Sequence, residues 1–178
     1  MIAHLPVLIV FIPLFAAVLI PLVARVSPRG ARLASVAACG ATLACALTAL
    51  TRVLDTGSWH YHLGGWPPPW GIEYVIDPLS GGMAVLVAFV AFLTSVYADA
   101  QRRLLPATGA GLFGCLLMLL VAGLLGIIVT GDLFNLYVFL EISSIAAYGL
   151  LSAGGVRAVV ATFRYLLLGT IAASFYLL

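Results

Sequence analysis

The sequence predicts an all-α protein, a polytopic transmembrane helix bundle of about six spanning helices. Hydrophobic residues make up 64% of the 178 residues, and charged residues make up 8%. The mean hydropathy of +1.22 is typical of membrane proteins and not of soluble domains of this size. The chain also contains six apolar runs, each close to the ~20 residues that a helix needs to cross a bilayer.

These apolar runs define the predicted helices in chain order. The first run has no basic start and no small-residue cleavage site, so we expect a retained helix rather than a signal peptide. Residues 1–178 are treated as a single transmembrane domain with one long outer loop at 55–76. The predicted helices span residues 5–24, 33–54, 78–98, 109–130, 133–152 and 158–178.

The loop at 55–76 holds all three tryptophans of the chain, which predicts an aromatic cap at the membrane interface. Its triple proline, Pro67 to Pro69, excludes a helix and favours an extended strap. His60 and His62 alternate as in an HxH metal motif, but no histidine or cysteine nearby in the sequence completes a ligand set. We therefore predict no metal site and no cofactor.

The arginines predict the orientation of the helices, because cytoplasmic loops are rich in positive charge. Three connectors are rich in arginine and alternate with connectors that hold only Arg52 at a helix end. Both chain ends are therefore expected on the outer, periplasmic side of the cell (inner) membrane. The chain has no lysine and no basic patch, so nucleic acid is not an expected partner. The arginines of the predicted cytoplasmic set are Arg25, Arg29, Arg32, Arg102, Arg103 and Arg157.

Small residues recur at a four-residue spacing in the fourth run, at Ala110, Gly114, Ala122 and Gly126, with Met118 interrupting the pattern. This spacing lets the backbones of neighbouring helices approach closely. One interpretation is a docking seam for another subunit. The other, which is the commoner case, is close packing within one bundle.

Glu141 is an acid in the middle of the apolar fifth run. A charge at the bilayer centre costs about 2.5–3.5 kcal/mol on insertion scales, and residues that bear such a charge mark ion or proton pathways. The alternative is a structural acid bonded to a neighbouring helix. Asp132 follows Gly131 at the start of the same run and is better explained as the N-cap of the helix.

The helical phase places Tyr137, Glu141, Ser144 and Tyr148 in one sector of the fifth helix, at ~100° per residue. Three hydroxyl side chains beside a carboxylate can bond it or hold water, as a proton path requires. Residue counting places Arg164, in the sixth run, at a similar depth. Two alternatives follow: an ion pair between Glu141 and Arg164, or an arginine that extends toward the cytoplasmic surface.

The segment TGDLFNLYVFLEISSIAAYGLL at 130–151 resembles the fifth-helix signature of antiporter-like membrane subunits. Respiratory complex I, Mrp-type cation/proton antiporters and membrane-bound hydrogenases share this family. The segments LGGWPPPWGIEYVIDPLSGGM at 63–83 and FRYLLLGTIAASFYLL at 163–178 resemble the loop entering its third helix and its sixth helix. The GGW-P-P-GI and GDLFNL phrases are most similar to the D-type subunit of Mrp antiporters and its hydrogenase relatives.

The resemblance implies the N-terminal part of a fold of about fourteen helices in two inverted repeats. It also implies a path for protons or sodium, with other membrane subunits as partners. In the family, the acid matching Glu141 pairs with a lysine on a broken seventh helix, which this chain lacks because it ends at Leu178. Arg164 stands where relatives often have a lysine. A fragment, a split subunit and a short structural relative are the three explanations, and the apolar end favours a fragment.

Two classes of function remain. The first is a proton-translocating or cation/proton antiporter subunit that uses intramembrane charges, and the second is a non-transporting structural subunit or inactive fragment. No self-contained active site is predicted, because the sequence has no nucleophile–base set, no glycine-rich phosphate loop and no cysteine set for an iron–sulfur cluster. Any redox chemistry of an NADH–quinone oxidoreductase or hydrogenase complex would reside in partner subunits.

Overall fold

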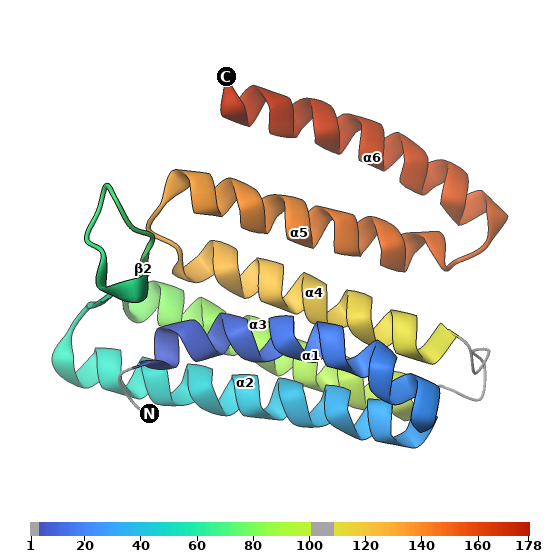
Figure 1. The fold of residues 1–178 in the computed structure, drawn as a ribbon, viewed down its shortest axis with the longest axis horizontal. Helices are drawn as coiled ribbons and strands as arrows, with labels where there is room; N and C mark the ends of the chain where they lie inside the picture. The colour runs from blue at the N-terminus through green and yellow to red at the C-terminus, as the bar shows by residue number, and fades with distance from the viewer. Residues whose placement is uncertain (1–3, 101–108) are drawn as a thin grey trace.

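The computed structural model describes residues 4–100 and 109–178, and within these ranges six helices are long and apolar enough to cross a membrane. The predicted all-α transmembrane bundle is confirmed (Figure 1). Arg102 and Arg103 of the predicted cytoplasmic set lie outside the described residues. The helices are α1 (Leu5–Val26), α2 (Pro28–Thr56), α3 (Pro78–Ala100), α4 (Gly109–Val129), α5 (Leu133–Ser152) and α6 (Val156–Leu177).

Side-chain caps set the beginnings of α2 and α3. α2 begins at Pro28 rather than at the predicted residue 33, because Ser27 Oγ accepts a hydrogen bond of 3.1 Å from a backbone amide of the first turn. Before α3, Asp77 Oδ1 accepts from the Ser80 amide at 2.6 Å, and Ser80 Oγ accepts from the Asp77 amide at 2.8 Å. Hydrogen bonds from the backbone amide and the side chain of Ser80 hold the pKa of the Asp77 carboxyl below its ordinary value.

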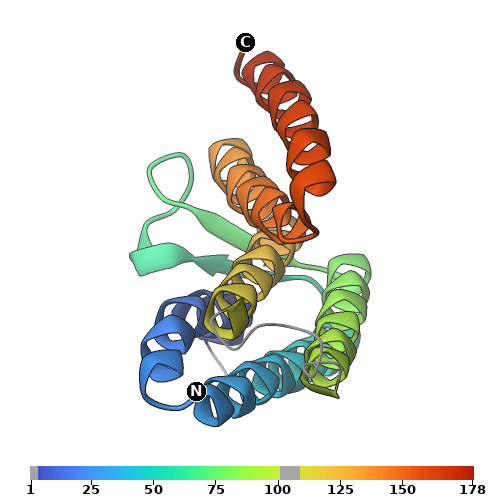
Figure 2. The same cartoon turned by 90° about the vertical axis from the view of Figure 1, so that its right-hand side faces the viewer.

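α4 is the central helix of the bundle. α1 packs against α2 and α4, α2 also packs against α3, and α4 packs against α3 and α5. α5 lies between α4 and α6, so α6 forms the edge of the bundle (Figure 2). In an apolar stretch of 18 residues in α4, half of the residues are buried inside the bundle, whereas in the corresponding stretch of α6 only 6% are buried. Most of the surface of α6 is therefore uncovered.

Three of the small residues of α4, Gly114, Ala122 and Gly126, face the interior of the bundle. A Cβ added to Gly114 would lie 2.9 Å from Ile20 Cγ2, on α1, and a Cβ on Gly126 would overlap the ring of Phe139, on α5. Ala122 and the interrupting Met118 are both fully buried. The four-residue pattern thus serves close packing within one bundle, and the interpretation as a docking seam for another subunit is wrong for this part of α4.

The loop between α2 and α3 folds into a hairpin that the sequence did not predict. Strand β1 (Trp59–His62) pairs antiparallel with β2 (Glu73–Ile76), and a short 3-10 turn, η2 (Leu63–Gly65), follows β1. The triple proline forms a turn, with a cis Pro68–Pro69 bond and a backbone hydrogen bond of 3.1 Å from Trp70 to Pro67. The expected extended strap is therefore wrong, because the chain must reverse direction to pair β2 with β1.

The hairpin, the start of α1 and the end of α6 lie at the same end of the bundle (Figure 1). The opposite end holds the turn between α1 and α2, with Arg25 and Arg29, and the turn between α5 and α6, with Arg157. The arginines of the described chain are therefore segregated, apart from Arg52 near the hairpin and Arg164 inside α6.

Candidate functional site

Glu141 is the ninth of the 20 residues of α5, close to the middle of the helix. Its side chain is half-buried. Within residues 4–100 and 109–178, the structure shows no hydrogen bond and no ion pair for its carboxylate. A structural acid bonded to a neighbouring helix is therefore not what the described chain contains.

One face of α5 packs against α4. Phe139, Ser143 and Ala146 are buried there, and the helices approach so closely that a Cβ on Gly123 would lie 2.7 Å from Ser143 Cβ. Ser143 donates its hydroxyl hydrogen to the Leu140 carbonyl at 2.9 Å. The residues of this face lie about half a turn from Glu141, so the acid is on the opposite side of the helix.

The side of α5 that bears Glu141 faces α6. Tyr137 stacks on Tyr176 with ring centroids 6.1 Å apart, and Tyr148 meets the ring of Tyr165 edge-on at 5.0 Å. Because these two tyrosines of α5 share the sector of Glu141 and Ser144, the polar stripe follows the α5–α6 interface. We call Tyr137, Glu141, Ser144 and Tyr148 the α5 stripe.

The structure does not pair Glu141 with Arg164. The tyrosine contacts fix the register of the two helices and place Ala172 opposite Glu141, eight residues from Arg164, which corresponds to ~12 Å of helix rise. Arg164 also lies two residues, ~200° in helical phase, from Thr162, which is buried against α5. Its side chain is exposed on the far side of α6. The similar depth expected from residue counts is wrong because the ends of the helices are not level.

A polar network at the start of α5 anchors this helix to the hairpin. Asp132 accepts a hydrogen bond of 2.6 Å from the Asn135 amide, as predicted for the N-cap. Asn135 Nδ2 donates to Thr130 Oγ1 at 2.9 Å, and Thr130 forms an isolated β-bridge with Tyr74 of the hairpin. The Gly131 amide donates a hydrogen bond of 2.9 Å to the backbone oxygen of the hairpin residue just before Tyr74. The sequence indicated only the cap, because the other contacts join distant segments.

We expect Asp132→Ala to lower the stability of the chain by about 1 kcal/mol, the usual cost of losing an N-cap, or about 2–4 °C in melting temperature. Thermal unfolding of the purified protein in detergent measures the effect. Asp132→Asn is the matched control, because asparagine also accepts the capping hydrogen bond and should melt close to the wild type. Equal losses in both variants would show that the charge, and not the cap, matters.

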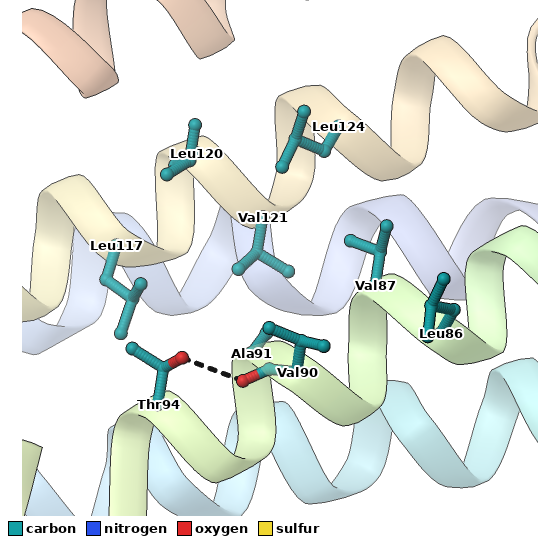
Figure 3. A pocket seen from close by; sticks show the side chains of 9 residues that line it. All are labelled: Leu86, Val87, Val90, Ala91, Thr94, Leu117, Leu120, Val121 and Leu124. Atoms are coloured by element: carbon teal, nitrogen blue, oxygen red, sulfur yellow. Dashed lines mark hydrogen bonds between the residues drawn. The ribbon is translucent and has the colours of Figure 1, made fainter. Parts of the chain in front are cut away.

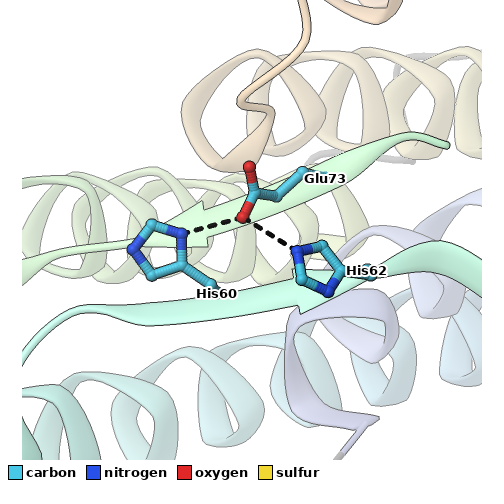
Figure 4. Close-up of polar contacts among 3 residues, drawn as sticks. All are labelled: His60, His62 and Glu73. Carbon is cyan, nitrogen blue, oxygen red and sulfur yellow. Dashed lines mark hydrogen bonds and ion pairs between the residues drawn. The ribbon is translucent and has the colours of Figure 1, made fainter. Parts of the chain in front are cut away.

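Two histidines and one acid meet on the hairpin (Figure 4). Glu73 Oε1 lies 2.8 Å from His60 Nδ1 and 3.3 Å from His62 Nε2. The HxH alternation is visible in the sequence, but the proximity of Glu73 is not, because only the strand pairing brings it to the histidines. Among the described residues, no group of three histidine, cysteine or acidic side chains has a geometry that could hold a metal ion.

A groove of about 330 Å³ lies between α3 and α4 (Figure 3). Its one hydroxyl, on Thr94, donates its hydrogen to the Val90 carbonyl at 2.8 Å and so has none left to donate to a ligand. An apolar groove of this kind cannot hydrate or coordinate an ion, so it is not part of an ion path. The groove is lined by Leu86, Val87, Val90, Ala91, Thr94, Leu117, Leu120, Val121 and Leu124.

Known proteins resemble the whole chain, although no family model matches it. The chain is 54% identical over 179 residues to the N subunit of NADH-quinone oxidoreductase from Desulforudis audaxviator, covering all of this chain and 36% of that protein. It is 42% identical over 123 residues to the D-type subunit of a probable K(+)/H(+) antiporter from Rhizobium meliloti, covering 68% and 22% of the two chains. The chain thus spans 22–36% of the length of these curated relatives.

Two solved structures have the same fold. The membrane-bound sulfane sulfur reductase, an archaeal respiratory membrane complex, contains a chain with a TM-score of 0.90 and 30% identity, matched over 98% of this chain and 36% of that one. The Mrp complex from Dietzia sp. DQ12-45-1b contains one with a TM-score of 0.83 and 26% identity, matched over 97% and 32%. These similarities and the six spanning helices identify a multi-pass membrane protein. The chain belongs to the family of antiporter-like membrane subunits that includes the N subunit of NADH-quinone oxidoreductase and the D-type subunits of cation/proton antiporters.

Proposed function

We propose that the chain forms part of a membrane subunit that translocates protons or exchanges cations for protons, and that Glu141 is the group that binds the transported ion. The position of Glu141 supports this function: a half-buried acid near the middle of α5, without a partner among the described residues. Such a carboxylate is costly to keep in a membrane unless it binds and releases an ion. The relatives include a K(+)/H(+) and a Na(+)/H(+) antiporter subunit, so protons and monovalent cations are the candidate ions.

The other members of the α5 stripe extend the path to either side of Glu141. Because α5 begins beside the hairpin, Tyr137 lies toward that end of the helix, and Ser144 and Tyr148 lie toward the opposite end. From Tyr137 to Tyr148 the helix rises ~16 Å, about half of a hydrocarbon core. Their hydroxyl groups can both donate and accept hydrogen bonds, so they can pass a proton or hold a water molecule beside the carboxylate.

Arg164 supports the proposal that other membrane subunits or further helices cover α6. The arginine is exposed near the middle of a helix of membrane length, on the side that faces away from α5. An arginine facing lipid at this depth is unfavourable by about 2.5–3.5 kcal/mol on insertion scales. We propose that a helix outside this chain covers it and that Arg164 acts on the ion path from that side.

We also propose that the hairpin end faces the outer, periplasmic side of the cell membrane, because the arginine-bearing turns lie at the other end. Single cysteines at Ser58 and Ala153, in a chain without its native cysteines, test this orientation. Both positions are exposed, in the connection between α2 and β1 and in the α5–α6 turn. A membrane-impermeant maleimide added to intact cells should label Ser58→Cys, and Ala153→Cys only after permeabilisation. The reverse pattern would contradict the proposed orientation.

The transport proposal is tested in vesicles that contain the assembled complex and a pH gradient. Sodium or potassium added on one side should draw protons out from the other side, because exchange moves the cation and the proton in opposite directions, and this movement should disappear when the carboxylate of Glu141 is replaced at an unchanged level of complex. A non-transporting structural subunit predicts instead that the same replacement harms assembly or has no effect.

A further inference from the structure

The outward face of the hairpin brings together three titratable side chains that are separate from the α5 stripe. In the β1–β2 register, His62 lies directly opposite Glu73, and His60 lies on the same face two residues away along β1. Both imidazoles reach the same carboxylate oxygen, at 2.8 and 3.3 Å (Figure 4). The exposed fractions of the three side chains are 57% for His60, 41% for His62 and 19% for Glu73. The carboxylate is thus enclosed while the histidines remain open to water.

Two imidazoles therefore share one carboxylate oxygen. A neutral imidazole has one N–H to donate, and protonation converts its bond to a carboxylate into a stronger, charge-assisted one. Histidine is the side chain whose ordinary titration falls between about pH 5 and 8. We propose that His60, His62 and Glu73 form a proton-binding site whose protonation tightens the hairpin on the beginning of α5.

The hairpin is bonded to α5 through the same strand that holds the carboxylate. The backbone oxygen of Glu73 accepts the 2.9 Å hydrogen bond from Gly131, which lies two residues before α5. The next strand residue, Tyr74, bridges to Thr130, whose hydroxyl binds Asn135 in the first turn of α5. Stiffening of β2 by protonation is therefore transmitted directly to the beginning of the helix that bears Glu141.

His4 and Arg52, which also lie near the hairpin, have separate partners. On the opposite face of β1, His4 bonds Tyr61 at 2.8 Å, and the Arg52 guanidinium lies 3.7 Å from the centre of the Trp59 ring. These contacts engage α1 and α2 with the inner face of the strand.

On the α5 side of the hairpin, Asp132 follows Gly131 and serves as the N-cap. Asp77, after β2, caps α3. Burial raises the pKa of Tyr74, which keeps this phenol neutral in the histidine range. Among the described residues, Glu73 is therefore the anion that the two imidazoles share.

Hydrogen–deuterium exchange of the full chain in nanodiscs tests the proposal. After correction for intrinsic exchange rates, segments 59–62 and 73–76 should be about two- to fivefold better protected at pH 5.5 than at pH 8, as expected for exposed charge pairs. The protection should be present below the histidine range and be lost as the pH rises through it. Residues 130–136 should follow in the same direction, because they are bonded to β2.

Two variants and a matched control complete the experiment. Glu73→Gln and the double variant His60→Asn/His62→Asn should remove the pH dependence, whereas His4→Gln, which removes an exposed histidine bonded on the other face, should retain it. Protection of α4 in every variant reports that the bundle is folded.

A wild-type hairpin equally protected at both pH values overturns the site, as does protection that appears only when zinc is added. A change in the hairpin without one in residues 130–136 overturns the coupling to α5. None of these outcomes depends on whether Glu141 binds the transported ion.

Discussion

Glu141→Gln is expected to reduce cation/proton exchange by the assembled complex at least about a hundredfold, the lower range for removal of a positioned proton-transfer group. Glutamine has nearly the same shape as glutamate but cannot bind and release a proton. Because the carboxylate has no hydrogen bond or ion pair among the described residues, its replacement leaves no partner unsatisfied. Assembly and stability should therefore be unchanged. The readout is the collapse of a pH gradient in vesicles after addition of sodium or potassium.

Two further variants sharpen this result. Glu141→Asp retains the carboxyl group but draws it back by one methylene, so a reduced and measurable rate is expected. Asp55→Asn, which removes an exposed acid at the end of α2, should exchange as fast as the wild type. Full exchange by Glu141→Gln at a normal level of complex would contradict the proposed role of this residue and favour a structural subunit.

The elements that could be predicted from the sequence are those determined by local pattern. Apolar runs of membrane length gave all six helices, since a backbone in lipid must satisfy its own hydrogen bonds. Helical phase likewise separated the α5 stripe from Asp132, because residues on one helix have a fixed angular relation. The contacts of Tyr137 and Tyr148 with α6 agree with that phase.

Relations between elements could not be predicted in this way. The depth of Arg164 relative to Glu141 depends on how far α6 slides along α5, which is set by the packing of tyrosine rings and not by counting residues from the helix ends. The hairpin strands have only four residues each, too few for a strong alternation signal. Glu73 therefore became a neighbour of His60, 13 residues away, only once the strands were paired.

The α4–α5 interface provides the second large expected effect. Gly126 lies against the buried ring of Phe139, and even a single Cβ at this position would overlap the ring. Leucine adds three further carbon atoms, so Gly126→Leu must push α5 away from α4 or force Phe139 out of its rotamer. Overpacking of this kind costs about 1–3 kcal/mol, and more where the backbone cannot shift. We expect a melting temperature lower by about 5–10 °C, or failure to fold.

Gly82→Leu is the matched control for this substitution, because Gly82 is also inside a helix and nothing lies within 4 Å of an added Cβ. Both variants exchange glycine for leucine in a spanning helix, so a difference between them isolates the contact with Phe139. Adding Phe139→Ala to Gly126→Leu makes room for the new side chain and should recover part of the lost stability, which a double-mutant cycle measures as coupling. A Gly126→Leu protein that melts with the wild type would show that α4 and α5 are not held as closely as the structure has them.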